Sequence, residues 1–182
     1  MTEVKILLEG YASIDSGGRS CSTVALVRDG DIVMVIDPGT LPSQKVLIDA
    51  LKKEGLGIND VNLVGITHSH MDHYRNIGMF PNAKVIDYWG WWDNDLYLEC
   101  DGNVSENISI TETPGHSYDN ITFLVKTEKG KIGICGDVFW KKDFPEKDPF
   151  AQDLKELDKS RKKVLEIADY IIPGHGKMFK TK

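Results

Sequence analysis

All five histidines of this 182-residue chain lie in short segments whose composition suits metal binding. Three fall in Thr67-His68-Ser69-His70-Met71-Asp72-His73, and two follow Pro-Gly pairs in Pro114-Gly115-His116 and Pro173-Gly174-His175. A Gly136-Asp137 pair closes the apolar run Lys131–Cys135. Neutral imidazole and carboxylate are the ligands that zinc prefers. The predicted ligands, enough for two divalent ions, are His68, His70, Asp72, His73, His116, Asp137 and His175.

The spacing of these residues indicates how they would converge. His68 and His70 are two positions apart, so in extended backbone their side chains share a side and can hold one ion. Asp72 and His73 follow where the chain turns into a helix, and their side chains are expected to point toward a second metal position. Each Pro-Gly pair makes a fixed turn just before a ligand, which reduces the entropy lost on metal capture.

Size and composition predict one domain over residues 1–182 in the cytoplasm. The chain is long enough for one well-packed core and short for two. The longest apolar stretch, Val61–Ile66, is too short to cross a bilayer, and the N-terminus lacks the layout of a signal peptide. Cys21, Cys100 and Cys135 are odd in number and form no CxxC pair, which argues against a disulfide framework.

The net charge of −6 disfavours generic nucleic-acid binding, although basic residues gather near the C-terminus. Most of those before Ala168 are expected on the exposed face of a helix. The basic residues of this region are Lys155, Lys159, Arg161, Lys162, Lys163, Lys177, Lys180 and Lys182.

Hydrophobic periodicity predicts two groups of strands, each completed by a helix and a further strand. Helices are expected from Ser43 to about Glu54, from His73 to about Met79, and over Asp153–Ala168, whereas Trp89–Gly102 has no clean period and is predicted to be a long connection. The predicted strands are Val4–Glu9, Cys21–Val27, Ile32–Ile36, Val61–Ile66, Lys84–Asp87, Ile108–Glu112, Ile121–Thr127, Lys131–Cys135 and Tyr170–Ile172. This order favours two sheets packed face to face with helices outside, and ligand segments converging at one edge.

Taken together, the motifs resemble the metallo-β-lactamase superfamily, and the resemblance spans most of the chain. Within it, the sequence is most similar to the MBLAC-type metallo-β-lactamase domain-containing proteins, through Asn76-x-Gly78-x-Phe80-Pro81 and Gly136-Asp137-Val138-Phe139 among others. The resemblance implies an α/β fold, a four-layer αββα sandwich. It implies that His68, His70 and His116 hold one metal, that Asp72, His73 and His175 hold the other, and that Asp137 bridges them. Tyr74 and Arg75 replace the Gly-rich pair of many members, which separates this chain from glyoxalase-II-like enzymes.

Two close cations would acidify a water between them, giving a hydroxide nucleophile near neutral pH. We therefore expect a dinuclear metal-dependent hydrolase of a small ester, thioester, lactone or phosphodiester, with Asp72 as a catalytic residue that orients the nucleophile. Zinc is the expected metal, with iron and manganese as alternatives. A metal-dependent ribonuclease acting on RNA is the specific alternative. A mononuclear iron enzyme of the persulfide-dioxygenase type and a non-catalytic metal-bound module are further ones.

Aromatic residues flank the ligand motifs, and some of them are candidate substrate contacts. Trp140 and Phe139 directly follow Asp137, and Trp92 belongs to the tryptophan-rich stretch that begins at Trp89. These rings are expected either to line an apolar substrate pocket, or to pack a loop against the sandwich or form a homodimer contact. The expected partners are a small-molecule substrate or RNA, and no membrane.

Overall fold

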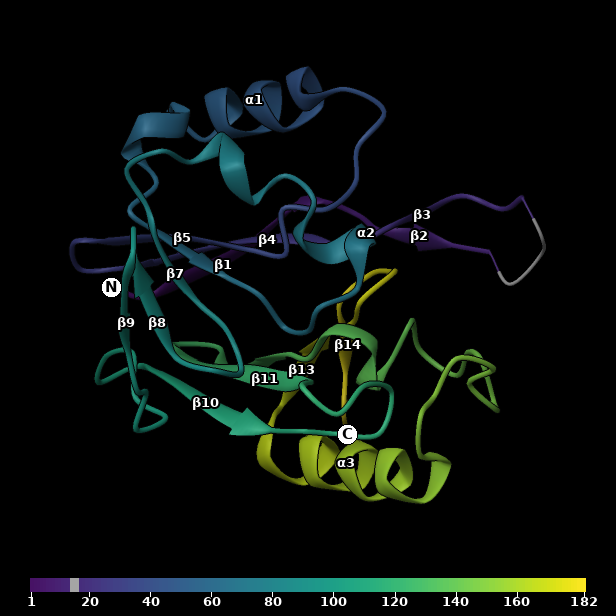
Figure 1. Cartoon of the computed structure of the whole chain (residues 1–182). Helices are drawn as coiled ribbons and strands as arrows, with labels where there is room; N and C mark the ends of the chain where they lie inside the picture. The colour runs from purple at the N-terminus through teal and green to yellow at the C-terminus, as the bar shows by residue number, and fades with distance from the viewer. Residues whose placement is uncertain (14–16) are drawn as a thin grey trace.

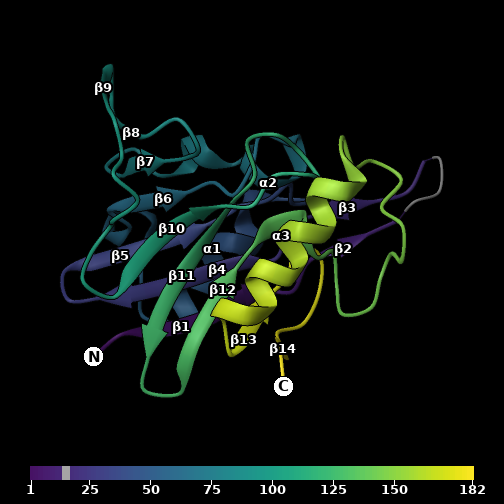
Figure 2. The same ribbon diagram turned by 90° about the horizontal axis from the view of Figure 1, so that it is seen from below.

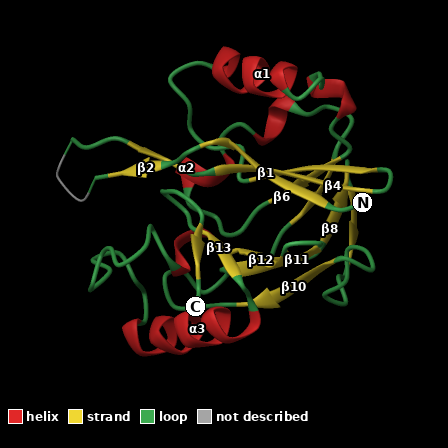
Figure 3. Ribbon diagram, turned by 180° about the vertical axis from the view of Figure 1, so that it is seen from behind, coloured by secondary structure: helices red, strands yellow, loops and turns green. Residues whose placement is uncertain are grey.

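The computed structural model describes residues 1–13 and 17–182, which fold into four layers (Figure 1). A seven-stranded sheet and a five-stranded sheet face each other, with helix α1 (Gln44–Lys53) outside the first and helix α3 (Leu154–Ile167) outside the second. This arrangement confirms the predicted αββα sandwich. Figure 3 shows the same layers from behind.

The first sheet is built largely from the first half of the chain. Its strand order is β1-β4-β5-β6-β7-β8-β9, with parallel pairing only from β5 to β7. The bounds are β1 Glu3–Leu8, β4 Val24–Asp29, β5 Ile32–Ile36, β6 Leu63–Gly65, β7 Lys84–Ile86, β8 Trp91–Asp93 and β9 Leu96–Leu98. A separate ribbon pairs β2 (Tyr11–Ala12) with β3 (Ser20–Cys21).

The second sheet comes from the second half and has the order β10-β11-β12-β13-β14. Figure 2 shows α3 lying across this sheet. The bounds are β10 Ile108–Glu112, β11 Ile121–Thr127, β12 Gly130–Ile134, β13 Tyr170–Ile172 and β14 Phe179–Lys180. The β12–β13 pair is parallel and the other pairs are antiparallel.

Three buried clusters fill the spaces between the layers. The central one packs residues of both sheets, such as Met34 and Phe123, face to face. A second lies under α1 around Leu47 and Leu51, and a third lies under α3 around Leu157. Apolar burial between four layers therefore fixes how the two sheets sit, and this in turn fixes which loops meet at their edge.

The long helices begin where the sequence predicted. The side chain of Ser43 accepts a hydrogen bond from the backbone N–H of Lys45, and Asp153 accepts from those of Lys155 and Glu156. Such caps satisfy backbone donors that a helix start leaves free. The described residues include no helix that is both long and apolar enough to cross a membrane.

Several local predictions differ from the structure. The segment Trp89–Gly102 is not a connection without structure, because β8 and β9 form a hairpin within it around Asn94, which has a positive φ of 56°. The predicted helix from His73 to Met79 is instead α2 (Met71–Tyr74) followed by a 3₁₀ turn, η2 (Ile77–Met79). Shorter 3₁₀ turns lie at η1 (Ile58–Asp60) and η3 (Gly136–Val138). The predicted strand Cys21–Val27 is divided into β3 and β4.

Candidate metal centre

The motifs named from the sequence meet at one edge of the two sheets. The segment after β6 carries His68 and His70, and α2 carries Asp72 and His73. From the second sheet come His116 after β10, Asp137 in η3 after β12, and His175 after β13. The seven side chains form two groups, one of His68, His70, His116 and Asp137, the other of Asp72, His73 and His175; within each group the ligand atoms lie within 4.8 Å of one another.

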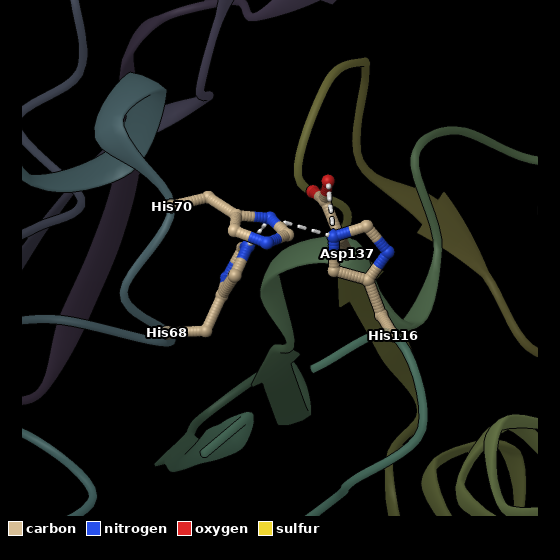
Figure 4. Close-up of side chains that lie close together, drawn as sticks. All are labelled: His68, His70, His116 and Asp137. Carbon is tan, nitrogen blue, oxygen red and sulfur yellow. Dashed lines mark hydrogen bonds and ion pairs between the residues drawn. The ribbon is translucent and has the colours of Figure 1, made fainter. Parts of the chain in front are cut away.

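In the first group, three imidazoles turn their nitrogen atoms toward a common point (Figure 4). His70 Nδ1 lies 3.0 Å from His68 Nε2 and 2.9 Å from His116 Nε2. Asp137 Oδ2 lies 3.3 Å from His116 Nε2. Tetrahedral zinc with bonds of about 2.0–2.1 Å would hold its ligand atoms about 3.4 Å apart, so these spacings fit one ion after a small expansion.

The second group lies on the other side of Asp137. Asp137 Oδ1 is 3.2 Å from His73 Nε2 and 3.2 Å from His175 Nε2. Asp72 Oδ2 is 3.6 Å from His175 Nε2. One carboxylate therefore faces both groups, with Oδ2 toward His116 and Oδ1 toward His73.

Two buried polar atoms at the centre lack hydrogen-bond partners among the described residues: His73 Nε2 and Asp137 Oδ1. They are 3.2 Å apart but are not aligned for a hydrogen bond. An unsatisfied buried polar atom costs about 1–3 kcal/mol, which a cation between the two would offset. The donor set, the spacing and these two atoms fit a divalent metal, so the His/Asp cluster is a metal-binding site.

Two buried aspartates each contact the Nδ1 atom of a histidine of the metal centre. His73 Nδ1 lies 2.8 Å from Asp37 Oδ2, and His116 Nδ1 lies 2.7 Å from Asp148 Oδ2. A carboxylate that accepts the Nδ1 proton leaves Nε2 free for a metal and increases its basicity. Sequence reasoning missed both aspartates. Asp37 stands in an Asp-Pro-Gly sequence that is typical of a turn, and Asp148 lies in a Pro-rich loop with no motif of its own.

The remaining histidines are held by uncharged groups. His175 Nδ1 donates to the backbone carbonyl of Cys21 at 3.0 Å. His68 Nδ1 lies 3.1 Å from Thr67 Oγ1, whose hydroxyl donates to Asp37 Oδ2 at 2.7 Å. His70 differs from the other histidines of its group, because its Nδ1 atom is the one that faces the Nε2 atom of His68. A carbonyl partner such as that of Cys21 has no side-chain signal, so it could not be named from the sequence.

Two glycines allow the close approach of these loops. A Cβ at Gly136, where φ is +52°, would collide with the side chain of Thr67. A Cβ at Gly174 would collide with the carboxylate of Asp137. Any larger residue at either position would therefore collide with the metal centre. At Gly136 the positive φ also disfavours residues other than glycine.

The charge distribution favours cation binding. Burial lowers the pKa of His68 well below its usual value, and nearby His73 lowers it further. Burial alone would raise the pKa of Asp137, but His175 and His73 hold it well below the usual range. Burial opposes protonation of His73, yet the carboxylates of Asp137 and Asp37 raise its pKa well above normal. Asp137 is thus held ionised, in the form that binds a cation.

A cavity of about 410 Å³ opens onto both groups. Asp72 lies on its wall with a side chain 24% exposed, and Ser20 of β3 donates a hydrogen bond to its Oδ2. Trp140 and Phe150 form an apolar wall, with their rings stacked at 5.7 Å. The site therefore combines a buried His/Asp cluster with an accessible mouth.

The three aromatic residues predicted to contact substrate lie in different places. Trp140 is 3% exposed and lies beside His116 and His175, on the cavity wall. Phe139 points elsewhere, packing on Phe179 in the cluster under α3. Trp92 lies on β8, where its ring contacts Tyr97, and it is not among the residues that line this cavity.

Solved structures share this architecture. A structure from Thermotoga maritima, assigned to the metallo-beta-lactamases, superposes with a TM-score of 0.78 over 98% of this chain and 99% of its own, at 24% identity. An N-acyl homoserine lactone hydrolase, with its product bound at its catalytic metal centre, superposes with a TM-score of 0.68 over 96% of this chain and 92% of its own, at 17% identity. At such identities these matches establish the fold.

The sequence comparison establishes the family. The profile of the metallo-beta-lactamase superfamily matches residues 17–99, which include the His-x-His-x-Asp-His motif. Metallo-beta-lactamase domain-containing protein 1 of Xenopus laevis is 32% identical over 98% of this chain and 81% of its own length. Its human counterpart is 31% identical over 91% of this chain and 65% of its own length. Because the likeness runs through both sheets and every ligand-bearing loop, this chain belongs to the metallo-β-lactamase superfamily.

Proposed function

We propose that this protein is a dinuclear metal-dependent hydrolase that cleaves a small ester, thioester, lactone or phosphodiester. The observation that carries the proposal is the position of Asp137 between the two groups. Its carboxylate lies 3.3 Å from His116 Nε2 of one group and 3.2 Å from His73 Nε2 of the other, and both of its oxygens lie 3.2 Å from His175 Nε2. A carboxylate between two cationic sites is suited to bridging ions about 3.5–4 Å apart. One ion held by His68, His70, His116 and Asp137 would leave the other three residues of the cluster without a metal to bind.

The residues of the site have different roles in the proposed reaction. His68, His70 and His116 would hold one zinc ion, Asp72, His73 and His175 the other, and Asp137 both. Bound there, the ions would supply Lewis acidity, which would lower the pKa of an attacking water and polarise the scissile bond. Asp72, on the cavity wall, orients that water. Asp37 and Asp148 fix the rings of His73 and His116, and the Trp140 wall excludes bulk water from one side.

The shape of the site supports a small substrate. The cavity that opens onto both groups is about 410 Å³, in the range of small-molecule sites. The structurally similar N-acyl homoserine lactone hydrolase, a protein of the same architecture, acts on a small lactone. These observations favour a small carbonyl or phosphoryl substrate over a long polymer.

Metal analysis and a substrate panel test the proposal. We expect two equivalents of zinc per chain, and turnover of at least one thioester, lactone, ester or phosphodiester that a chelator abolishes and zinc restores. His175→Ala should lose one equivalent, whereas Lys155→Gln on the exposed face of α3 should retain both. Stable binding of a single iron, with redox turnover of a persulfide, would instead establish the mononuclear alternative.

A ribonuclease is the second candidate, and the lysine-rich stretch from Lys155 to Lys182 favours it. RNA binding releases counterions, so affinity should then fall steeply with salt and with Lys162→Glu/Lys163→Glu. Small-substrate hydrolysis should be insensitive to Lys162→Glu/Lys163→Glu, whereas Trp140→Ala should raise KM through lost apolar contact. Robust RNA cleavage without turnover of any small substrate would replace our first proposal with this one.

A further inference from the structure

A second pocket of about 540 Å³ adjoins the metal cavity. The two share Ala12, Trp140 and His175 in their walls, so they lie side by side. We name this second space the lysine pocket, after its charged lining residues Lys141, Lys142 and Lys177.

The lysine pocket is cationic on an acidic protein. The whole chain carries a net charge of −6, yet the pocket has three lysines and one carboxylate, Glu9, in its wall. Among the described residues, none of the three ammonium groups forms an ion pair with a carboxylate; Lys141 instead lies over the ring of Phe144, 4.3 Å from its centroid. Charges of one sign gathered around a concave, partly apolar surface focus the field and attract an anion.

The loops that supply the metal ligands also fix the lysines. Lys141 and Lys142 follow Asp137 and Trp140 along the chain, and Lys177 follows His175. The backbone N–H of His175 donates to the carbonyl of Trp140 at 2.6 Å, which ties the two loops together. A Cβ at Gly176 would lie 2.8 Å from Lys141 Cβ, so only glycine permits this close packing. The lysine backbones are therefore held in a fixed relation to the metal centre.

Aromatic rings complete the wall of the lysine pocket. Tyr11 of the β2–β3 ribbon, Phe144 and Phe179 line it together with Trp140. Such a wall suits an apolar or aromatic linker, while ammonium groups suit a phosphate or carboxylate at its end. The pocket therefore matches an elongated substrate with a charged terminus, rather than a compact neutral one.

We propose that the lysine pocket binds the phosphate or carboxylate end of a small anionic substrate, whose scissile bond lies at the metal centre. This inference rests on the proposed hydrolase function and narrows its substrate class to anionic esters or thioesters. Lys142 and Lys177 provide the charge that recognises the anion, and the rings of Tyr11 and Phe144 cover the part of the substrate between the anion and the scissile bond.

Matched substrates and a binding probe test the proposal on the zinc-loaded protein. The substrates are acyl esters of one acyl group that end in a neutral amide, a carboxylate or a phosphate. The variant is Lys142→Gln/Lys177→Gln, and the control is Lys155→Gln/Lys162→Gln, which removes equal charge from α3. For the anionic substrates we expect KM to rise roughly tenfold in the pocket variant with kcat little changed, as expected for lost ground-state binding. The neutral ester and the control variant should show no such change.

Equilibrium binding of phenyl phosphate, measured by calorimetry, separates this inference from the hydrolase proposal. Roughly tenfold weaker binding in the pocket variant, with unchanged binding in the control, supports the anion site even if no ester is turned over. Equal binding in all three proteins, or an equal rise in KM for neutral and anionic esters, overturns it. Salt-dependent binding of a short RNA that is lost in the pocket variant, without any effect on phenyl phosphate, would assign the lysines to nucleic acid and also overturn it.

Discussion

The two groups of the metal centre lie on either side of Asp137 but differ in chemistry. The first group contributes three imidazole nitrogens, from His68, His70 and His116. The second contributes two imidazoles and the partly exposed carboxylate of Asp72, which accepts a hydrogen bond from Ser20 of the β2–β3 ribbon. The first group is thus rich in neutral nitrogen ligands, whereas the second is richer in charged oxygen. Both groups contribute residues to the cavity wall.

This difference has consequences for metal binding. Neutral nitrogen ligands favour zinc, whereas carboxylate oxygen also suits harder ions such as manganese. With one ion in each group, as proposed above, the second group should therefore exchange zinc for manganese more readily than the first.

Removing the shared ligand should have the largest effect. Asp137→Ala takes one ligand from both groups and leaves His73 Nε2 without its nearby carboxylate. We expect both equivalents of zinc to be lost after gel filtration, by elemental analysis. Asp169→Ala, an aspartate remote from the centre, is the control. Full two-metal occupancy in Asp137→Ala would show that the two halves do not share a ligand.

Substitution of the aspartates that contact histidine Nδ1 atoms should weaken metal binding in one group at a time. Asp37 accepts from Thr67 and His73, so Asp37→Ala should weaken the second ion about 10–100-fold. Asp148 accepts from His116, so Asp148→Ala should weaken the first ion, by about tenfold. Zinc titration in competition with a chelator measures the two affinities. If both variants weakened the same ion, the assignment of ligands to two groups would be wrong.

Acidification should release the two ions in sequence. Burial lowers the pKa of His68 and of His70. Burial opposes protonation of His175 as well, but Asp137 raises its pKa, as it does that of His73. Protons compete with metal for imidazole, so groups with a raised pKa lose their ion at higher pH. As the pH falls, the second group should therefore empty first and the first group at a lower pH.

A zinc-binding dye that follows release during a pH titration checks this order. Asp72→Ala should lack the phase at higher pH, and His70→Ala the phase at lower pH. Simultaneous release of both equivalents in the parent protein would contradict the difference between the groups.

Substitution of Ser20 should have the smallest effect on zinc affinity. Its hydroxyl donates to Asp72 Oδ2, and a hydrogen bond to a partly exposed carboxylate contributes about 0.5–1.5 kcal/mol. Ser20→Ala should weaken only the second ion, by roughly threefold, and Ser20→Thr should preserve it. The same competitive titration measures both, and an equal loss in the threonine variant would indicate a role other than the hydrogen bond.

Much of this site could be predicted because histidines are few. Each of the five lies in a motif next to a strand end, so the order of strands alone brings His68 and His116 to one edge. The four-layer architecture followed from the same order of elements and is confirmed. The assignment of each side chain to an ion stays a prediction that the experiments above test.

The supporting residues could not be predicted, since their roles come from tertiary contact. Asp37 and Asp148 look like any turn or loop aspartate, and only packing brings them behind imidazoles. The β8–β9 hairpin was missed for a different reason. Leu96, Tyr97 and Leu98 are all exposed, so the strand shows no alternation between a buried and an exposed face.

The contact between His175 and Cys21 also bears on the order in which the centre is made. A ribosome synthesises the His-x-His-x-Asp-His segment long before Asp137 and His175. The strand that starts at Val24 meets the last ligand loop through the Thr23 N–H, which donates to the Gly174 carbonyl at 2.6 Å. The group of Asp72, His73 and His175 is not complete until that late loop has emerged and docked on the early one. A chain that has not yet reached His175 can therefore offer a metal the first group of ligands but not the complete second group.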